Sequence, residues 1–185
     1  FQHQYPLRTG LHKEEFRNKY FSQAAAKAVN QLLLHWQQQN HIQLTNNTVA
    51  LADFTPKPSP ALQAWREKTE KALYEAGFAP PAWHTLLTDL PETEPSEVLP
   101  WLISCGQVVK LQEDMVFHQA KLQTAQKLAL AELEKNQELS LGTMRDLLQT
   151  SRKYALAILE YLDQQKITKR QGDIRVKYDT STTSS

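Results

Sequence analysis

The sequence predicts a mainly α-helical protein with small β-hairpins, an α+β fold made of three similar segments. Three observations support this prediction. Apolar residues recur at helical spacing in several runs, short runs of β-forming residues flank polar turns, and the two patterns alternate in the same order three times, about sixty residues apart. The composition of the 185 residues, 41% hydrophobic and 22% charged, is ordinary for a globular protein.

Three β-hairpins are expected, over residues 41–54, 107–120 and 166–179. Their polar bends fall at Asn46-Asn47, Glu113-Asp114 and Gly172-Asp173. Asn, Asp and Gly tolerate the positive φ angles that tight hairpin turns require. The three bends therefore predict two short antiparallel strands in each segment.

An amphipathic helix is expected before each hairpin, over residues 24–39, 95–106 and 151–165. In the last of these, the apolar side chains recur at i, i+4, i+7 and i+8, which places them on one helical face; they are Tyr154, Ile158, Tyr161 and Leu162. Pro100 should shorten or kink the second helix. Further helices are expected at 12–21, 59–77, 81–90, 121–137 and 142–149.

A helix, a short helix, a third helix and a hairpin in that order form a winged-helix module, a helix-turn-helix followed by a hairpin "wing". We therefore expect a tandem array of three modules, over residues 1–55, 61–118 and 119–178, with the first lacking its N-terminal helix. The short join between the second and third modules predicts that they pack closely. Residues 56–60 are expected to be a stiff Pro-rich linker and residues 179–185 a disordered polar tail.

The composition limits where such a protein works. Cys105 is the single cysteine, so no internal disulfide is possible and a reducing, cytoplasmic setting is expected. No apolar run approaches the length of a membrane span. The chain begins with Phe1 and shows no signal-peptide pattern, so we expect a piece of a longer protein.

A search for catalytic patterns predicts no enzyme. The sequence has no Gly-rich phosphate loop, no GxSxG and no HExxH. His35 and His41 lie close in sequence, but no cysteine or carboxylate completes a metal set. Cys105 is expected to be a small core residue, and a solvated loop is expected around Glu92, Glu94 and Glu97. We therefore expect no metal and no cofactor in this chain.

The net charge of +1 is unevenly distributed. Lys and Arg against Asp and Glu number 6 and 3 in residues 1–60, 4 and 9 in residues 61–120, and 11 and 8 in residues 121–185. The three parts therefore carry +3, −5 and +3. A polyanion would meet only part of such a chain.

The first basic cluster lies at the expected start of the helix at 151–165. Thr150 or Ser151 is expected to be the N-cap, with Arg152 and Lys153 in the first turn. Cations oppose the positive end of the helix dipole, and stability alone favours Asp or Glu there. The exposed N–H groups together with Arg and Lys predict a phosphate site, the alternative being a pair of solubilising charges.

The second basic cluster lies on the hairpin at 166–179. Ile174, Val176 and Tyr178 alternate with cations, so the apolar set is expected to cover the core while Arg175 and Lys177 face outward. On the first strand we expect Thr168 and Arg170 outward and Lys169 on the other face, near the tip. Arg145 adds a cation from the preceding short helix. The alternative is a charged edge that prevents strand-to-strand aggregation.

Two stretches resemble a known family. "YPLRTGLHKEEFRNKYF" at 5–21 and "LLQTSRKYALAILEYLDQQKITKRQGDIRV" at 147–176 resemble the C-terminal region of bacterial SelB, the selenocysteine-specific translation elongation factors. The resemblance implies a GTPase part that carries selenocysteinyl-tRNA, followed by four winged-helix modules, the last of which binds the mRNA hairpin that recodes UGA. The chain would then hold the second module without its start, the third and the fourth.

The resemblance also implies a site and partners. RNA contacts are expected at the helix start and in the hairpin, with an mRNA stem-loop as ligand, the ribosome as a partner of the full-length protein, no membrane, and a monomer. GTP and Mg would belong to the absent GTPase part. The expected RNA-binding residues are Arg145, Ser151, Arg152, Lys153, Lys169, Arg170, Gln171, Gly172, Asp173 and Arg175.

Two other function classes stay open at this point. A winged-helix regulator of duplex DNA would present a polar helix face, whereas "YALAILEYL" becomes apolar soon after Lys153. Tandem winged helices also serve as protein-interaction scaffolds, and the acidic middle segment suits that role. In the first module we expect a weaker, nonspecific RNA contact around Arg8, Lys13, Arg17 and Lys19.

Overall fold

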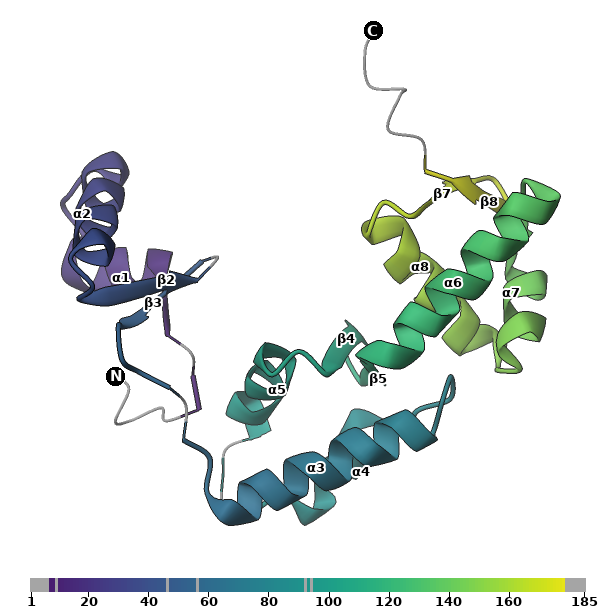
Figure 1. Cartoon of the computed structure of the whole chain (residues 1–185), viewed down its shortest axis with the longest axis horizontal. Coiled ribbons are helices and arrows are strands. Elements are labelled where there is room, and N and C mark those ends of the chain that lie inside the picture. Colours follow the sequence, from purple (N-terminus) through teal and green to yellow (C-terminus); the bar gives the residue numbers. More distant parts are fainter. Residues whose placement is uncertain are drawn as a thin grey trace, which may run out of the picture. The chain divides into compact units, whose positions relative to one another are not determined.

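The predicted helices and hairpins follow one another along the chain in the predicted order (Figure 1), and two short strands, β1 (Leu11–His12) and β6 (Leu139–Ser140), are added to them. The computed structural model describes residues 7–8, 10–45, 47–55, 57–91, 93 and 95–178. Its residues group into two compact units, one of residues 1–63 and 91–104, the other of residues 64–90 and 105–185. Pro56 of the predicted linker and the predicted tail at 179–185 lie outside the described residues.

The first module, residues 10–51, holds a three-stranded sheet and two helices. Its elements are β1 (Leu11–His12), α1 (Lys13–Tyr20), α2 (Ala26–Gln38), β2 (Ile42–Thr45) and β3 (Thr48–Leu51), with strand order β1-β3-β2. Val29, Leu33 and Val49 form its buried core. A Cβ at Gly10 would lie 2.7 Å from the carbonyl oxygen of Val49, so only glycine fits where the chain approaches β3.

The third module, residues 119–178, repeats this plan with one more helix. Its elements are α6 (Gln119–Asn136), β6 (Leu139–Ser140), α7 (Leu141–Leu148), α8 (Arg152–Gln164), β7 (Thr168–Gln171) and β8 (Ile174–Lys177), with strand order β6-β8-β7. The face of α8 predicted from its spacing is confirmed: Ile158 and Leu162 are fully buried, and Tyr154 and Tyr161 are half-buried. They pack with Leu139 and with α6 and α7 in one core.

The first and third modules match position by position. α1 and α7 have 8 residues each, α2 and α8 have 13 each, and the strands have equal lengths. The register is also the same, because Leu11 pairs with Val49 as Leu139 pairs with Arg175. Each position of α1 and α2 therefore has a defined equivalent in α7 and α8. The α1–α2 connection, residues 21–25, is longer than the α7–α8 connection at 149–151.

Between these modules lie α3 (Pro60–Glu75), α4 (Trp83–Leu86), the 3-10 helix η1 (Leu87–Asp89), α5 (Pro95–Ser104), β4 (Val108–Gln112) and β5 (Met115–His118). α5 continues through Pro100 and has 10 residues, shorter than α2 and α8 as predicted. Since α5 belongs to one compact unit and β4 and β5 to the other, the boundaries 61–118 stay a prediction.

The β4–β5 hairpin shares a core with the third module. Met115 and Phe117 of β5 are buried in the same cluster as Leu122 of α6 and Ile158 of α8. The ring of Phe117 meets that of Tyr154 edge-on, with centroids 6.2 Å apart. This hairpin therefore packs closely on the third module, whereas close packing of the whole predicted second module stays a prediction. Within the described part of the chain, no helix is long and apolar enough to cross a membrane.

Candidate nucleic-acid interface

The start of α8 presents two cations that no acidic side chain in its first turn balances. Ser151 is the N-cap residue in an extended conformation, and its hydroxyl makes no capping hydrogen bond. Arg152 and Lys153 follow in the first turn, and all three residues are exposed. The first N–H groups of a helix have no partner within it and carry partial positive charge. This end of α8 therefore fits an anion such as a phosphate.

The turn that leads into α8 is held in place from the α3–α4 connection. Thr150 donates its hydroxyl to the carbonyl oxygen of Phe78 at 2.6 Å, and the Tyr154 hydroxyl donates to that of Pro80 at 3.0 Å. Gln149 ends α7 in the left-handed conformation, with φ at 48°. Of the two N-caps left open by the sequence, Ser151 takes the position and Thr150 serves as an anchor. The α8 start is thus preorganised.

The bend of the β4–β5 hairpin lies near the same end of α8. Asp114 accepts from the backbone N–H of His84 at 3.0 Å and lies 2.7 Å from Nδ1 of its ring. That backbone bond, the His84 ring and the charge of Lys153 together lower the pKa of the Asp114 carboxyl. Lys153 therefore already has a negative neighbour, and an RNA phosphate would compete with Asp114 for it.

The tip of the third-module hairpin is exposed. Gly172 occupies the bend with φ at +61°, a conformation that favours glycine, and nothing lies within 4 Å of the position of a Cβ there. Arg170 donates through Nε to the carbonyl oxygen of Gly172 at 3.0 Å, which holds its guanidinium along the bend. The neighbouring candidates are exposed as well: Lys169, Gln171 and Asp173.

The outward orientation predicted for Arg175 is wrong. Its side chain is only 3% exposed, and its Nε lies 3.4 Å from Oδ2 of Asp163 in the last turn of α8. Thr168, also predicted to face outward, is buried and donates its hydroxyl to Oδ1 of Asp163. Arg175 pairs with the buried Leu139 of β6, so its face of the sheet is the core-facing one, while Ile174 and Val176 lie on the other face.

This inversion has a physical cause. A carboxylate at the end of α8 compensates the guanidinium, so a cation takes a core-facing position on β8 where an apolar residue was expected. Nη2 of Arg175 is buried without a hydrogen-bond partner among the described residues. Arg175 is thus removed from the surface, whereas the next cation on this face, Lys177, is exposed. Lys177 was not among the predicted RNA-binding residues, although strict alternation along the strand indicated that it faces outward.

Arg145 is exposed but not free. Its Nε and Nη2 lie 2.8 and 2.7 Å from Oδ1 of Asp146, the next residue. An exposed pair of this kind contributes little to stability and leaves the guanidinium partly accessible. A phosphate near α7 would have to share Arg145 with Asp146.

The two predicted clusters are anchored at opposite ends of α8, which is about 20 Å long. The repeat between modules indicates nevertheless that they border one face. In the first module, the residues at the positions of Arg145, Arg152, Arg170 and Asp173 are Arg17, Ala26, Leu44 and Asn47, and these four line a single groove. By this equivalence we expect the candidate residues to surround a shared face formed by α7, α8 and the wing.

The other candidates from the sequence form no site. Cys105 is half-buried and accepts a weak hydrogen bond from Arg66 at 3.5 Å. Glu97, expected in a solvated loop, is buried in α5 and pairs with Arg8 at 2.9 Å. No group of three or more His, Cys, Asp or Glu side chains in the described ranges could hold a metal ion. His3, Glu92, Glu94 and the bend residue Asn46 lie outside those ranges.

Comparison with known proteins places these features in one family. Two family models described as "Elongation factor SelB, winged helix" match the chain, that of the second winged helix over residues 1–51 and that of the third over residues 131–176, together just over half of the chain. The last segment thus matches the model of the third winged helix, whereas the resemblance predicted that it is the fourth.

A curated relative and two solved structures agree with this match. The selenocysteine-specific elongation factor of Desulfomicrobium baculatum is 26% identical over 172 residues, which cover 92% of this chain and 27% of the relative, so the chain spans about a quarter of its length. The mRNA-binding domain of elongation factor SelB from E. coli, solved in complex with SECIS RNA, has 22% identity and a TM-score of 0.54, covering 66% of this chain and 100% of that one.

The crystal structure of bacterial selenocysteine-specific elongation factor EF-Sec has 18% identity and a TM-score of 0.53, covering 92% of this chain and 26% of that one. At these identities the two solved structures show a shared fold. The matched models cover both ends of the chain, the relative covers nearly all of it, and the modules have the expected winged-helix order. The chain belongs to the winged-helix region of the SelB elongation factors.

Proposed function

We propose that this chain is the RNA-binding part of a selenocysteine-specific elongation factor, and that its third module holds the mRNA stem-loop that recodes UGA. The observation that carries this proposal is the exposed start of α8, where two cations stand at an uncapped, positively polarised helix end. Both cations oppose the helix dipole, which disfavours them for stability and supports a binding role for this surface. The SelB structure solved with SECIS RNA supports the choice of ligand.

The side chains divide into two roles. Arg152, Lys153 and Arg170 contact phosphates, which contribute affinity and salt dependence. Gly172 lets the backbone approach a base that is splayed out of the loop, and Asp173 accepts hydrogen bonds from its edge. Lys177, which is exposed, replaces the buried Arg175 as the RNA-contacting cation of β8. Arg145, Ser151, Lys169 and Gln171 are exposed as well, with Lys169 and Gln171 on the opposite face of the hairpin from Arg170.

The burial pattern of α8 disfavours a reader of duplex DNA. A helix that lies in the major groove needs several outward polar positions along its length. In α8 most positions after Lys153 are buried or half-buried, and the exposed ones are Glu160 and Gln164. A helix used end-on suits a loop and its flanking phosphates, because the major groove of an RNA stem is too deep and narrow to admit side chains.

The proposal extends to the setting of the whole protein. The chain matches winged-helix modules and not a catalytic part, so we place no catalysis and no cofactor in it. GTP and Mg would be bound by the rest of the longer protein, which would work with the ribosome in the cytoplasm. We propose that the chain itself is a monomer.

An equilibrium titration tests the proposal. The chain is titrated with a small RNA stem-loop from a selenocysteine-recoding mRNA, with the same stem carrying an altered loop, and with duplex DNA of equal length. We expect the native stem-loop to bind at least about a hundredfold more tightly than the other two, since loop bases carry the specificity. Equal affinity for all three ligands, or no binding to RNA, would exclude the proposed function.

A further inference from the structure

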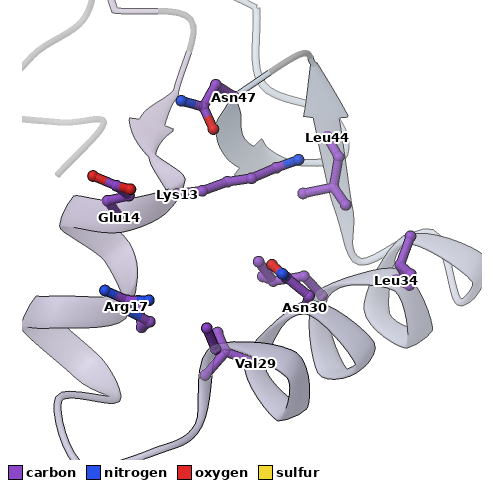
Figure 2. A pocket seen from close by; sticks show the side chains of 10 residues that line it. Lys13, Glu14, Arg17, Val29, Asn30, Leu34, Leu44 and Asn47 are labelled. Carbon is purple, nitrogen blue, oxygen red and sulfur yellow. The ribbon is translucent and has the colours of Figure 1, made fainter.

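α1, α2 and the β2–β3 hairpin of the first module enclose a groove of about 600 Å³ (Figure 2). Its volume lies within the range of small-molecule sites in proteins. In Figure 2 the Lys13 side chain reaches from α1 across the groove toward Leu44, and Asn30 points into the space from α2. α7 and α8 pack directly against each other whereas α1 and α2 make few direct contacts, and the longer α1–α2 connection is compatible with that separation.

The lining of the groove combines three kinds of side chain. Lys13 and Arg17 of α1 supply positive charge, with Glu14 beside them as an acidic residue. Asn30 and Asn47 supply amide groups, and Nδ2 of Asn47 lies 2.7 Å from Nε2 of His12, which fixes the amide in place. Cations, fixed amides and apolar walls are the groups that recognise a nucleotide, through its phosphate, its base edge and its base plane in turn.

The apolar wall is where the first module departs from the third. Leu34, 53% exposed, stands at the position of Glu160, and Leu44 at the position of Arg170. An exposed leucine on a recognition helix gains nothing in the free chain, whereas a charged residue is tolerated at the equivalent position of α8. The groove thus shares one cation position with the third module, Arg17 for Arg145, but has an apolar wall suited to a base.

Arg17 is also better placed for a ligand than its equivalent. Arg145 is held by the carboxylate of Asp146, whereas the residue after Arg17 is Asn18, which carries no charge. Arg8, another cation once expected to touch RNA in this module, is engaged by Glu97. Arg17 is therefore, with Lys13, a groove-lining cation of the first module, and the one whose third-module equivalent is held by a carboxylate.

We propose that this groove binds a nucleotide of a single-stranded RNA segment. Lys13 and Arg17 contact its phosphate, Leu34 and Leu44 cover the faces of its base, and Asn30 and Asn47 hydrogen-bond the base edge. The site is separate from the stem-loop surface on the third module and goes beyond the function proposed above. It is a second RNA contact, for an unpaired strand.

The experiment is a fluorescence-anisotropy titration of the whole chain with labelled hexauridylate and hexaadenylate. Arg17→Ala removes one of the two groove cations, and Leu34→Glu puts the third module's residue into the wall. Lys19→Ala is the matched control, since it removes an exposed cation of α1 that does not line the groove. We expect hexamer affinity to fall about tenfold for each groove variant and less than about twofold for Lys19→Ala. Thermal melts of the three variants should match the parent.

The outcomes separate this proposal from the first one. Arg17→Ala should leave the affinity for a blunt-ended stem-loop unchanged. If the parent chain binds the hexamers but not the stem-loop, only the function proposed above is contradicted. Absence of hexamer binding, or an equal loss for Lys19→Ala and Arg17→Ala, would overturn the groove as a nucleotide site. Tighter, Arg17-dependent binding of an acidic amphipathic peptide would overturn it in favour of a protein ligand.

Discussion

Arg175 is a buried cation at the base of the third-module wing, where the first module carries Val49. Its partner Asp163 stands at the position of Gln37, and Thr168 at that of Ile42. The fold therefore accepts an apolar residue at this place. A buried ion pair adds little net stability over a hydrophobic equivalent, but it ties three elements together, α8, β7 and β8, with defined geometry.

Removal of one partner should be costly. Asp163→Ala leaves the Arg175 guanidinium buried without compensation, and we expect the free energy of unfolding to fall by about 2–4 kcal/mol, somewhat below the value for a fully buried pair because Asp163 is partly exposed. The double variant Asp163→Gln/Arg175→Val, which copies the first module, should recover most of that loss. Urea unfolding measures both. A double variant as unstable as the single one would contradict this account.

The exposure of most candidate site residues could be predicted from the sequence, but the face of β8 on which each side chain lies could not. Alternation along β8 defines two faces, but it does not say which one meets the core. Because Ile174 and Val176 are apolar, their face was predicted to meet the core, and that prediction is wrong. The deciding residue, Asp163, lies twelve positions earlier on another element. The tertiary packing of α8 against β7 and β8 brings its carboxylate to Arg175 and Thr168.

At the scale of elements, the N-termini of α7 and α8 differ in a way that matters for function. Ser140 caps α7 by accepting from the N–H of Thr143 at 3.0 Å, whereas Ser151 leaves the first turn of α8 uncapped. A capped start serves stability, and an uncapped cationic start leaves N–H groups for a ligand. Among these two adjacent helices, only α8 has a start suited to RNA.

The start of α6 should make stability depend on pH. Its N-cap His118 accepts from the N–H of Ala120, which requires the neutral ring, and burial lowers the pKa of His118 below its ordinary value of 6.5, with Lys121 acting in the same direction and Glu70 opposing. The unfolded chain then binds the proton more readily, so the stabilisation is full above about pH 6.5 and declines as the pH falls below it.

His118→Asn keeps an acceptor for the cap and removes the titration. Thermal melts of the parent and of this variant between pH 7.5 and pH 5.5 measure the difference between them. We expect the parent to lose more stability than the variant over this range, since other titrating groups act equally on both. Identical slopes would rule out His118 as the source.

Helices were predictable as elements because their apolar spacing extends over two turns or more. β1 and β6 were not predicted, since two-residue strands leave no alternation to detect. They complete the three-stranded sheets and fix which face of each wing meets the core. The missed strands and the wrong face of β8 are thus one error, because β6 places Leu139 beside Arg175.

At the scale of the whole molecule, the first and third modules have the same architecture but a different distribution of charged side chains. The first and third modules share element lengths and register, yet the cations that suit a stem-loop gather at the α8 start and wing tip of the third. The bend of the middle hairpin is instead tied to α4, since the N–H of Trp83 donates to the carbonyl oxygen of Asp114 at 3.1 Å. The uneven distribution of charge along the sequence had already predicted that the RNA-binding cations belong to the third module and not to the acidic middle segment.

The most direct test of the central claim compares equivalent positions in two modules. Stem-loop RNA is titrated at several salt concentrations against the parent chain, the variant Arg152→Ala/Lys153→Ala, and Lys27→Ala, which removes the cation of α2 that stands where Lys153 stands in α8. We predict that the double variant loses about ten- to a hundredfold in affinity and that its salt slope falls by about two, while Lys27→Ala binds as the parent does. An unchanged affinity for the double variant, or an equal loss for Lys27→Ala, would contradict the assignment of the stem-loop to the third module.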